Sequence, residues 1–267
     1  MNNLHHFIIV RLAQNSGLSH NIEKIGFDSK ESFYKKRIDI YDNITRASLA
    51  NQTNQNFTLI SLVQGSAVLN GQDFGAKLPN EHILYNNGNK NSSINSFLKE
   101  KYKDIDCVIF TRLDSDDALP INFVEEVQNH YKKDIDGYID TYVDVNDMFV
   151  YSNIHKRIKK ICPSYTSQFI SFLEKRNDAG FFDIFVYAQS HAKVGFIRKG
   201  ERIKHLSAFR FIGDHNVTSD SQFQSESKLN ATERSKSFSI FTFFNLGLGK
   251  TFGIKKDFLE GYQKNDL

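Results

Sequence analysis

The stretch that decides the fold reads CVIFTRLDSDD and runs from Cys107 to Asp117. Its first four residues form a continuous apolar run, which is typical of a strand buried on both faces of a parallel sheet. Three carboxylates follow where this strand ends, at Asp114, Asp116 and Asp117. Ligands of open α/β sheets bind outside the carboxyl ends of the strands. The sequence therefore predicts an acidic ligand site at the end of a buried strand.

Strand-like and helix-like segments alternate along the rest of the chain. The expected strands are short apolar runs, and the expected helices carry apolar residues at helical spacing. Strands are expected at 6–12, 57–63, 81–85, 107–110, 138–143, 148–151, 182–189, 193–198 and 207–212, and helices at 29–49, 92–102 and after Pro120. This alternation predicts an α/β fold with a mostly parallel, Rossmann-like central sheet and helices on both faces.

Two of the expected helices have candidate N-terminal caps. Asp28 and Glu31 have the spacing of a capping box before the first helix. Asp117 lies close to the start of the helix after Pro120, and we expect it to cap that helix.

The composition is that of an ordinary globular protein. The chain has 267 residues, of which 40% are hydrophobic and 24% charged, and this is enough to bury a core. We expect one domain at 1–220 and a C-terminal extension at 221–267. The Phe and Lys residues of the extension either pack on the core or contact a membrane surface.

Charge and hydropathy exclude two classes of protein. The net charge of +3 is too small for a nucleic-acid-binding surface, and no stretch is long and apolar enough to span a membrane. The two cysteines, Cys107 and Cys162, are expected to stay reduced. The sequence predicts a cytoplasmic protein, at most peripheral at the inner face of the membrane.

The acidic residues have the spacing of a metal site. Asp114 and Asp116 occupy alternate positions in extended chain, so their carboxylates can point the same way. Two carboxylates suit a hard ion such as Mg²⁺ or Mn²⁺ that also binds diphosphate oxygens. A solvated turn, or the metal site of a phosphohydrolase, are the alternatives for the same residues. Ala118 and Leu119 argue against a haloacid-dehalogenase phosphatase and an EF-hand loop, which need other residue types at these positions.

Four segments resemble one known family. Residues 47–60 resemble the first helix, Gln-containing turn and second strand of GT-A glycosyltransferases, and residues 111–119 resemble the metal-binding segment of the "putative rhamnosyltransferase" family. The first strand, which ends in Arg11, and residues 211–216 are similar to the same family. The resemblance implies a GT-A fold and metal-dependent transfer of a sugar, such as rhamnose. The donor would be a nucleotide sugar, and the acceptor a saccharide or lipid-linked glycan.

The resemblance also implies a donor site. Arg11 would lie near the nucleotide, and Gln64 stands where many relatives have an acidic residue that contacts the base. The identity of the nucleotide therefore stays open. Arg112 and Ser115 belong to the acidic segment and complete the predicted site, although Arg112 could equally form a structural ion pair.

The same resemblance implies the metal ligands. Asp114 and Asp116 would face the ribose and the metal, and His215 matches a position that often supplies a late metal ligand. A hydrogen-bonded structural histidine is the alternative for His215.

The catalytic base is predicted from its place in the chain. An inverting transferase needs a carboxylate that takes the proton of the acceptor hydroxyl. Asp183 is the predicted base, with Glu174 and Asp178 as alternatives. Two other functions are open: a phosphohydrolase that uses the same aspartates, or a non-catalytic protein that binds glycans or nucleotides.

Overall fold

The computed structural model describes residues 4–13, 29–64, 74–86, 89–152, 157–163, 166–188, 191–212 and 237–264. The described strands are β1 (His5–Ala13), β2 (Thr58–Gln64), β3 (Glu81–Asn86), β4 (Cys107–Asp114), β5 (Asp117–Ala118), β6 (Tyr142–Ser152), β7 (Arg157–Ile161), β8 (Ser171–Lys175), β9 (Gly200–Ile212) and β10 (Ser237–Phe238). The described helices are α1 (Lys30–Ile40), α2 (Ala47–Ala50), α3 (Lys90–Lys101), α4 (Phe123–Lys132), α5 (Ile135–Tyr138), α6 (Phe185–Ala188), α7 (His191–Ile197), α9 (Ile240–Asn245), α10 (Leu248–Thr251) and α11 (Lys256–Lys264).

The strands form one sheet with the order β10-β7-β6-β8-β4-β1-β2-β3. Strands β3, β2, β1 and β4 are parallel, and β8 runs antiparallel between β4 and β6. Strand β9 pairs in parallel with almost the whole of β6 and reaches the acidic segment through β5. The predicted α/β fold class, with a mostly parallel central sheet, is confirmed.

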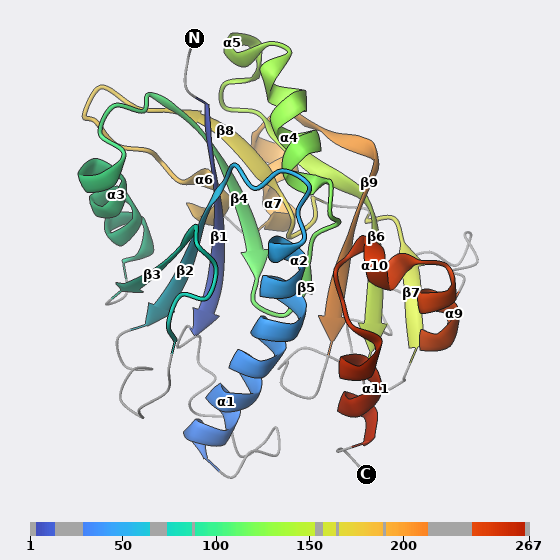
Figure 1. The fold of residues 1–267 in the computed structure, drawn as a ribbon. Helices are drawn as coiled ribbons and strands as arrows, with labels where there is room; N and C mark the ends of the chain where they lie inside the picture. Colours follow the sequence, from blue (N-terminus) through green and yellow to red (C-terminus); the bar gives the residue numbers. More distant parts are fainter. Residues whose placement is uncertain are drawn as a thin grey trace.

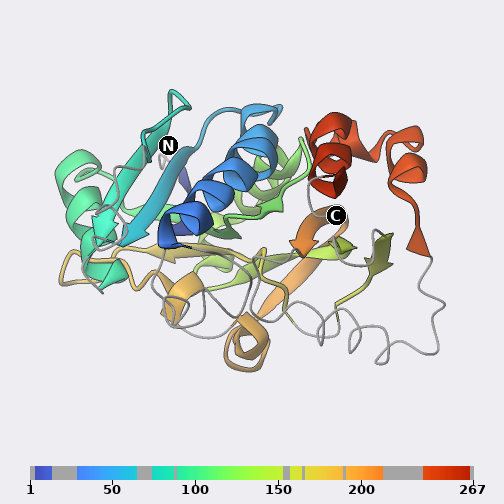
Figure 2. The same ribbon diagram turned by 90° about the horizontal axis from the view of Figure 1, so that it is seen from below.

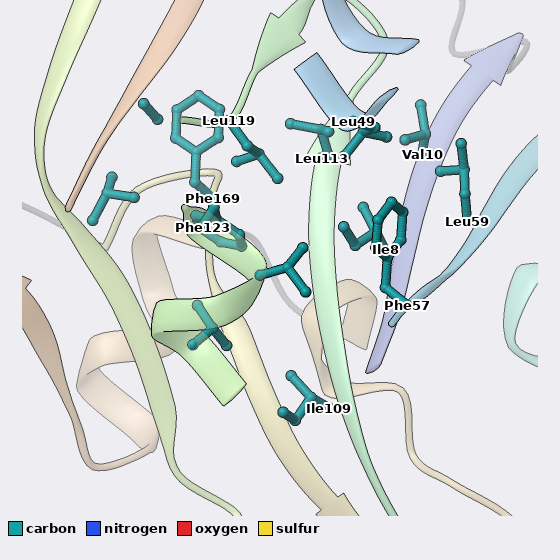
Figure 3. Close-up of a cluster of buried hydrophobic side chains, with 14 of the residues drawn as sticks. Ile8, Val10, Leu49, Phe57, Leu59, Ile109, Leu113, Leu119, Phe123 and Phe169 are labelled. Carbon is teal, nitrogen blue, oxygen red and sulfur yellow. The ribbon is translucent and has the colours of Figure 1, made fainter. Parts of the chain in front are cut away.

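Helices cover both faces of the sheet, as Figure 2 shows. Alternate residues of β1 point to opposite sides. Ile8 and Val10 pack under α1, α2 and α4, while Phe7 and Ile9 pack against α3, α6 and α7. Figure 1 shows where these helices lie relative to the strands. Figure 3 shows the first of these cores, in which Phe123 of α4 lies among side chains of the central strands. Burial on both faces explains why β1 and β4 read as continuous apolar runs.

Four of the expected elements in the second half differ from the structure. The strands expected at 138–143 and 148–151 are one strand, β6, preceded by α5, and the strands expected at 182–189 and 193–198 are the helices α6 and α7. A short apolar run does not distinguish a strand from a buried helix by its periodicity.

Both predicted caps are corrected. The N-cap of α1 is Ser29, which forms a capping box with Ser32, and Asp28 lies outside the described residues. Helix α4 begins at Phe123 with Asn122 as its N-cap, and Asp117 lies in β5 instead. The helix expected at 29–49 is α1 and α2 joined by six residues of π-helix, Tyr41–Arg46.

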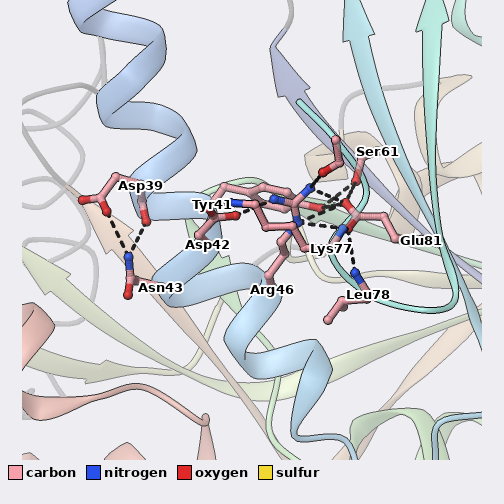
Figure 4. Close-up of polar contacts among 10 residues, drawn as sticks. Asp39, Tyr41, Asp42, Asn43, Arg46, Ser61, Lys77, Leu78 and Glu81 are labelled. Atoms are coloured by element: carbon pink, nitrogen blue, oxygen red, sulfur yellow. Dashed lines mark hydrogen bonds and ion pairs between the residues drawn. The ribbon is translucent and has the colours of Figure 1, made fainter. Parts of the chain in front are cut away.

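A buried ion pair fixes this π-helical segment to β3, as Figure 4 shows. The Nη2 of Arg46 donates to Glu81 Oε1 at 2.8 Å, and its Nε donates to both carboxylate oxygens at 3.1 and 3.0 Å. Tyr41 Oη and Ser61 Oγ also donate to Glu81, at 3.0 and 2.7 Å. The Glu81 side chain is completely buried and that of Arg46 is 4% exposed. A buried ion pair is stable only when hydrogen-bond donors satisfy the oxygens of its carboxylate. Arg46, Tyr41 and Ser61 supply these donors to Glu81.

The C-terminal segment packs on the far end of the sheet. Phe243 of α9 and Phe252 lie against Phe149 of β6 and Phe209 of β9, with ring centroids 5.4–6.2 Å apart. Leu259 and Tyr262 of α11 belong to the same buried cluster. None of the helices in the described ranges is both long enough and apolar enough to cross a membrane.

Candidate functional site

The predicted site lies where four parallel strands end together. In the register of β1 and β4, Arg11 is the partner of Asp114. Next to them, Gln64 ends β2 with its backbone paired to Asn86, the last residue of β3. The carboxyl ends of these strands form one edge, which is where ligands bind in open α/β sheets.

Asp114 is held by two arginines. Arg11 donates to Asp114 Oδ1 through Nη2 at 2.5 Å and Nε at 3.2 Å, and Arg112 Nη2 lies 3.7 Å from the same oxygen. Burial alone would raise the pKa of Asp114, but the charges of Arg11 and then Arg112 outweigh it and lower the pKa. Asp114 is therefore a stable carboxylate at neutral pH.

Ser115 and Asp116, the next two residues of the acidic segment, interact with different neighbours. Ser115 Oγ accepts a hydrogen bond from Arg37 Nη2 at 2.6 Å, which ties the segment to α1. Asp116 is buried, with 7% of its surface exposed, and its charge acts on both Arg11 and Asp117. The structure thus brings Arg11, Arg112, Asp114 and Asp116 together.

Asp117 is turned away from this group and into β9. Its carboxylate accepts the Phe211 N–H at 3.3 Å and a bond from Gln168 Nε2 at 3.4 Å. Burial first, and then the charges of Asp116 and Asp114, raise the pKa of Asp117 well above its ordinary value. Asp117 is therefore a structural residue that fixes the acidic segment to the last long strand.

A cluster of cations surrounds one tyrosine beside Asp114. Arg112 Cζ lies 5.6 Å from the ring centroid of Tyr187, and Arg11 Cζ and Lys90 Nζ each lie 5.8 Å from it. Burial, followed by repulsion from Arg11 and Arg112, lowers the pKa of Lys90. We call Arg11, Lys90 and Arg112 the cation cluster. Our sequence analysis missed Lys90 and Tyr187, although Lys90 follows closely after a predicted strand.

Helix α6 presents Tyr187 to the cluster and is fixed from three sides. Tyr187 Oη donates to the Ile9 carbonyl of β1 at 2.8 Å. Asn95 of α3 exchanges two hydrogen bonds with the backbone of Phe182, at 2.8 and 2.9 Å. Glu174 of β8 accepts the N–H groups of Ile184 and Phe185 at 2.8 and 2.5 Å. These bonds make α6 one wall of the site.

The three candidate bases lie outside the acidic segment, at the end of β8 and in the chain that leads to α6. Asp183 is exposed, and its carbonyl accepts a bond from Asn91 at the start of α3, at 3.1 Å. Asp178 is exposed in a turn. Glu174 is buried and accepts N–H groups at the start of α6, so it stabilises this wall of the site.

Glu174 gives the fold a predicted pH dependence. Burial raises the pKa of Glu174 to about 7, although the hydrogen bonds from the Phe185 and Ile184 N–H groups act in the opposite direction. Between pH 4.5 and 7 the native state then holds a proton that the unfolded chain releases, so stability is greatest below that window and falls as pH rises through it. We expect a loss of about 3 kcal/mol across the window. Urea unfolding at pH 5, 6, 7 and 8 should show this loss in the wild type and not in Glu174→Gln. The exposed control Glu125→Gln should retain it, and equal pH profiles for wild type and Glu174→Gln would contradict the assignment.

The glutamine of the predicted turn is structural. Gln52 Nε2 donates to the carbonyls of Ser48 and Pro120 at 3.1 and 2.8 Å, and its Oε1 accepts the Val124 N–H at 3.0 Å. It joins α2 to the loop after the acidic segment and to the start of α4. Gln52 therefore positions the segment without contacting the cation cluster.

The side chains of two predicted site residues lie outside the part of the chain that the structure describes. The backbone of Gln64 ends β2, and His215 lies outside the described residues. Within the described ranges, no group of three His, Cys, Asp or Glu side chains could hold a metal ion. An ion at Asp114 and Asp116 would need further oxygens from its ligand.

Fold and site together define a class of protein. Parallel strands that end at an acidic segment and a cation cluster can bind a ligand that carries both hydroxyl and phosphate groups. Residues 19–139 match the model of a family described as "Putative rhamnosyl transferase". The matched residues include the acidic segment, so the resemblance expected from the sequence is confirmed over this part of the chain.

Solved structures give looser likenesses. The chain is similar to a "putative nucleotide-diphospho-sugar transferase" from Desulfovibrio desulfuricans G20, with a TM-score of 0.38, 12% identity and coverage of 95% of this chain and 97% of the other. It is also similar to the 2-C-methyl-D-erythritol 4-phosphate cytidylyltransferase of Francisella tularensis, with a TM-score of 0.34, 8% identity and coverage of 85% and 98%. Among curated proteins, none matches the chain.

Proposed function

We propose that this protein transfers a sugar from a nucleotide-diphosphate donor to a saccharide acceptor. The observation that carries the proposal is the edge at which Arg11, Arg112, Asp114 and Asp116 meet. The last three of these residues lie inside a segment that matches a glycosyltransferase family. Arg11 and Arg112 can bind phosphate oxygens, and Asp114 and Ser115 can bind hydroxyl groups of the nucleotide. Gln64 ends the neighbouring strand, at a place suited to the base.

The site fits a divalent ion of the Mg²⁺ or Mn²⁺ kind. The carboxylate oxygens of Asp114 and Asp116 are hard donors, and such ions complete their shell with substrate phosphates and water. His215 is a further proposed ligand. When bound, the ion would neutralise charge on the leaving diphosphate. The protein's own part is to fix Asp114 through Arg11 and to hold the acidic segment through Ser115 and Asp117.

The finer specificity is part of the same proposal. The family description supports a deoxyhexose such as rhamnose as the sugar. A saccharide or lipid-linked glycan is the proposed acceptor, handled at the cytoplasmic face of a membrane. Asp183 is the proposed base, since it is exposed and follows the segment that α3 holds beside the site.

Calorimetric titration tests this proposal. A panel of nucleotide diphosphates and nucleotide sugars is titrated with manganese and with EDTA, on the wild type and on Asp116→Ala. We expect one nucleotide to bind with manganese and to lose at least about tenfold in affinity in the variant, because one carboxylate ligand is lost. Absence of binding to every nucleotide in both conditions would contradict sugar transfer. Release of inorganic phosphate without an acceptor would favour the phosphohydrolase instead.

A further inference from the structure

The cation cluster holds more positive charge than its protein partners balance. Arg11 pairs with Asp114 at 2.5 Å, and Arg112 reaches the same oxygen only at 3.7 Å. Among the described residues, none gives Lys90 a hydrogen bond or an ion pair; its recorded contact is with the Tyr187 ring. Arg11 and Arg112 therefore share Asp114, whose charge also acts on Lys90, and the charge of Asp116 acts on Arg11.

Arg112 supplies an independent sign of a missing partner. Its side chain is 9% exposed, and its Nε is buried without a hydrogen-bond partner. A buried guanidinium N–H with no acceptor costs about 1–3 kcal/mol, so such groups are rare unless a ligand completes them. Arg112, which carries this Nε, is the cation of the cluster that lies nearest to the Tyr187 ring.

Tyr187 cannot act as the counter-charge. Burial raises the pKa of its phenol, and its hydroxyl is used in the bond to the Ile9 carbonyl. Its ring face attracts cations and fixes the place at which they gather. The group that balances the cluster must therefore come from outside this part of the chain.

We propose that Arg11, Lys90 and Arg112, gathered around the ring of Tyr187, form an anion site that binds a diphosphate directly, without a metal ion. Planar guanidinium groups pair with two phosphate oxygens at once, and a lysine adds a point charge that adapts to a third. That this diphosphate is the donor's rests on the proposed function; the anion site itself does not. Lys90 and Tyr187 thereby become binding and positioning residues of the site.

Inorganic pyrophosphate in EDTA is the direct probe. Calorimetry should show saturable binding that weakens with added salt, because the contacts are ionic. Lys90→Gln should weaken it by about tenfold, the effect of losing one charged hydrogen bond. Lys90→Arg should restore most of the affinity. Lys99→Gln is the matched control, since Lys99 lies on the same helix over an exposed ring, Phe181, at 5.9 Å.

Three results decide the matter. Wild-type binding in EDTA, reduced in Lys90→Gln and unchanged in Lys99→Gln, supports the anion site. Absence of pyrophosphate binding in EDTA overturns it, and so does an equal affinity of the two variants. If pyrophosphate binds as expected but no nucleotide diphosphate binds more tightly than pyrophosphate, the anion site stands and the proposed function fails. Circular dichroism of each variant confirms that the comparison concerns folded protein.

Discussion

Replacing Glu81 by alanine is expected to lower the free energy of unfolding by about 3–5 kcal/mol, since it removes one partner of a buried ion pair. The carboxylate receives bonds from Arg46, Tyr41 and Ser61, and its side chain is fully buried. Burial would raise its pKa, but the bonds led by Arg46 outweigh this and lower it. The stabilisation is therefore complete above the unfolded-state pKa and is lost on acidification through the native pKa. Urea unfolding at pH 7 measures the effect.

An exposed glutamate provides the control for this prediction. Glu100 is 69% exposed in a surface pair with Lys101, and Glu100→Ala should change stability by less than about 1 kcal/mol. The double variant Glu81→Leu/Arg46→Met should be more stable than Glu81→Ala, because no buried charge is left unpaired. A loss below about 1 kcal/mol for Glu81→Ala would show that this pair does not hold the π-helical segment on the sheet.

Replacing Phe243 by alanine is expected to cost about 3–5 kcal/mol, the range for a buried aromatic side chain that leaves a cavity. Phe243 is fully buried, and its ring packs against Phe149, Phe209, Phe244 and Phe252 at 5.4–6.3 Å. The cavity would separate the C-terminal helices from β6 and β9. Urea unfolding followed by far-ultraviolet circular dichroism gives the loss.

Phe241 on the same helix is the matched control. Its side chain is 62% exposed, and Phe241→Ala should stay within about 0.5 kcal/mol of the wild type. Limited proteolysis distinguishes two ways in which Phe243→Ala can lose stability. Early release of the C-terminal helices indicates local detachment, and uniform digestion indicates global unfolding. Equal stability of both variants would mean that the C-terminal segment adds nothing to the fold.

The central half of the sheet could be predicted because its signal is local. Strands β1, β2 and β4 are buried on both faces, so each appears as a continuous apolar run. The acidic segment follows β4 directly, and the parallel register then places Arg11 opposite Asp114. The sequence predicted both residues at the donor site, Asp114 from its place after a buried strand and Arg11 from the family resemblance.

The remaining parts depend on contacts between distant residues. Helix α6 was mistaken for a strand because its four apolar residues fit both forms, and the carboxylate that supports its start, Glu174, is ten residues earlier. Lys90 and Tyr187 meet through a bond from Tyr187 to β1, 178 residues away in the sequence. Asp117 looked like a cap because its partner, Phe211, is 94 residues further along. No short window of the sequence contains the pairs of Tyr187 with β1 and of Asp117 with Phe211.

The pairing of β5 with β9 also has a consequence for biosynthesis. A ribosome releases the acidic segment long before it releases Phe211, whose N–H seats Asp117. A nascent or truncated chain that ends before β9 therefore lacks the contact that fixes the strand-end carboxylates in place. Such distant pairings form late and slowly. The capacity to bind a ligand should therefore appear only after β9 has been synthesised, and chains that end before β9 should remain inert.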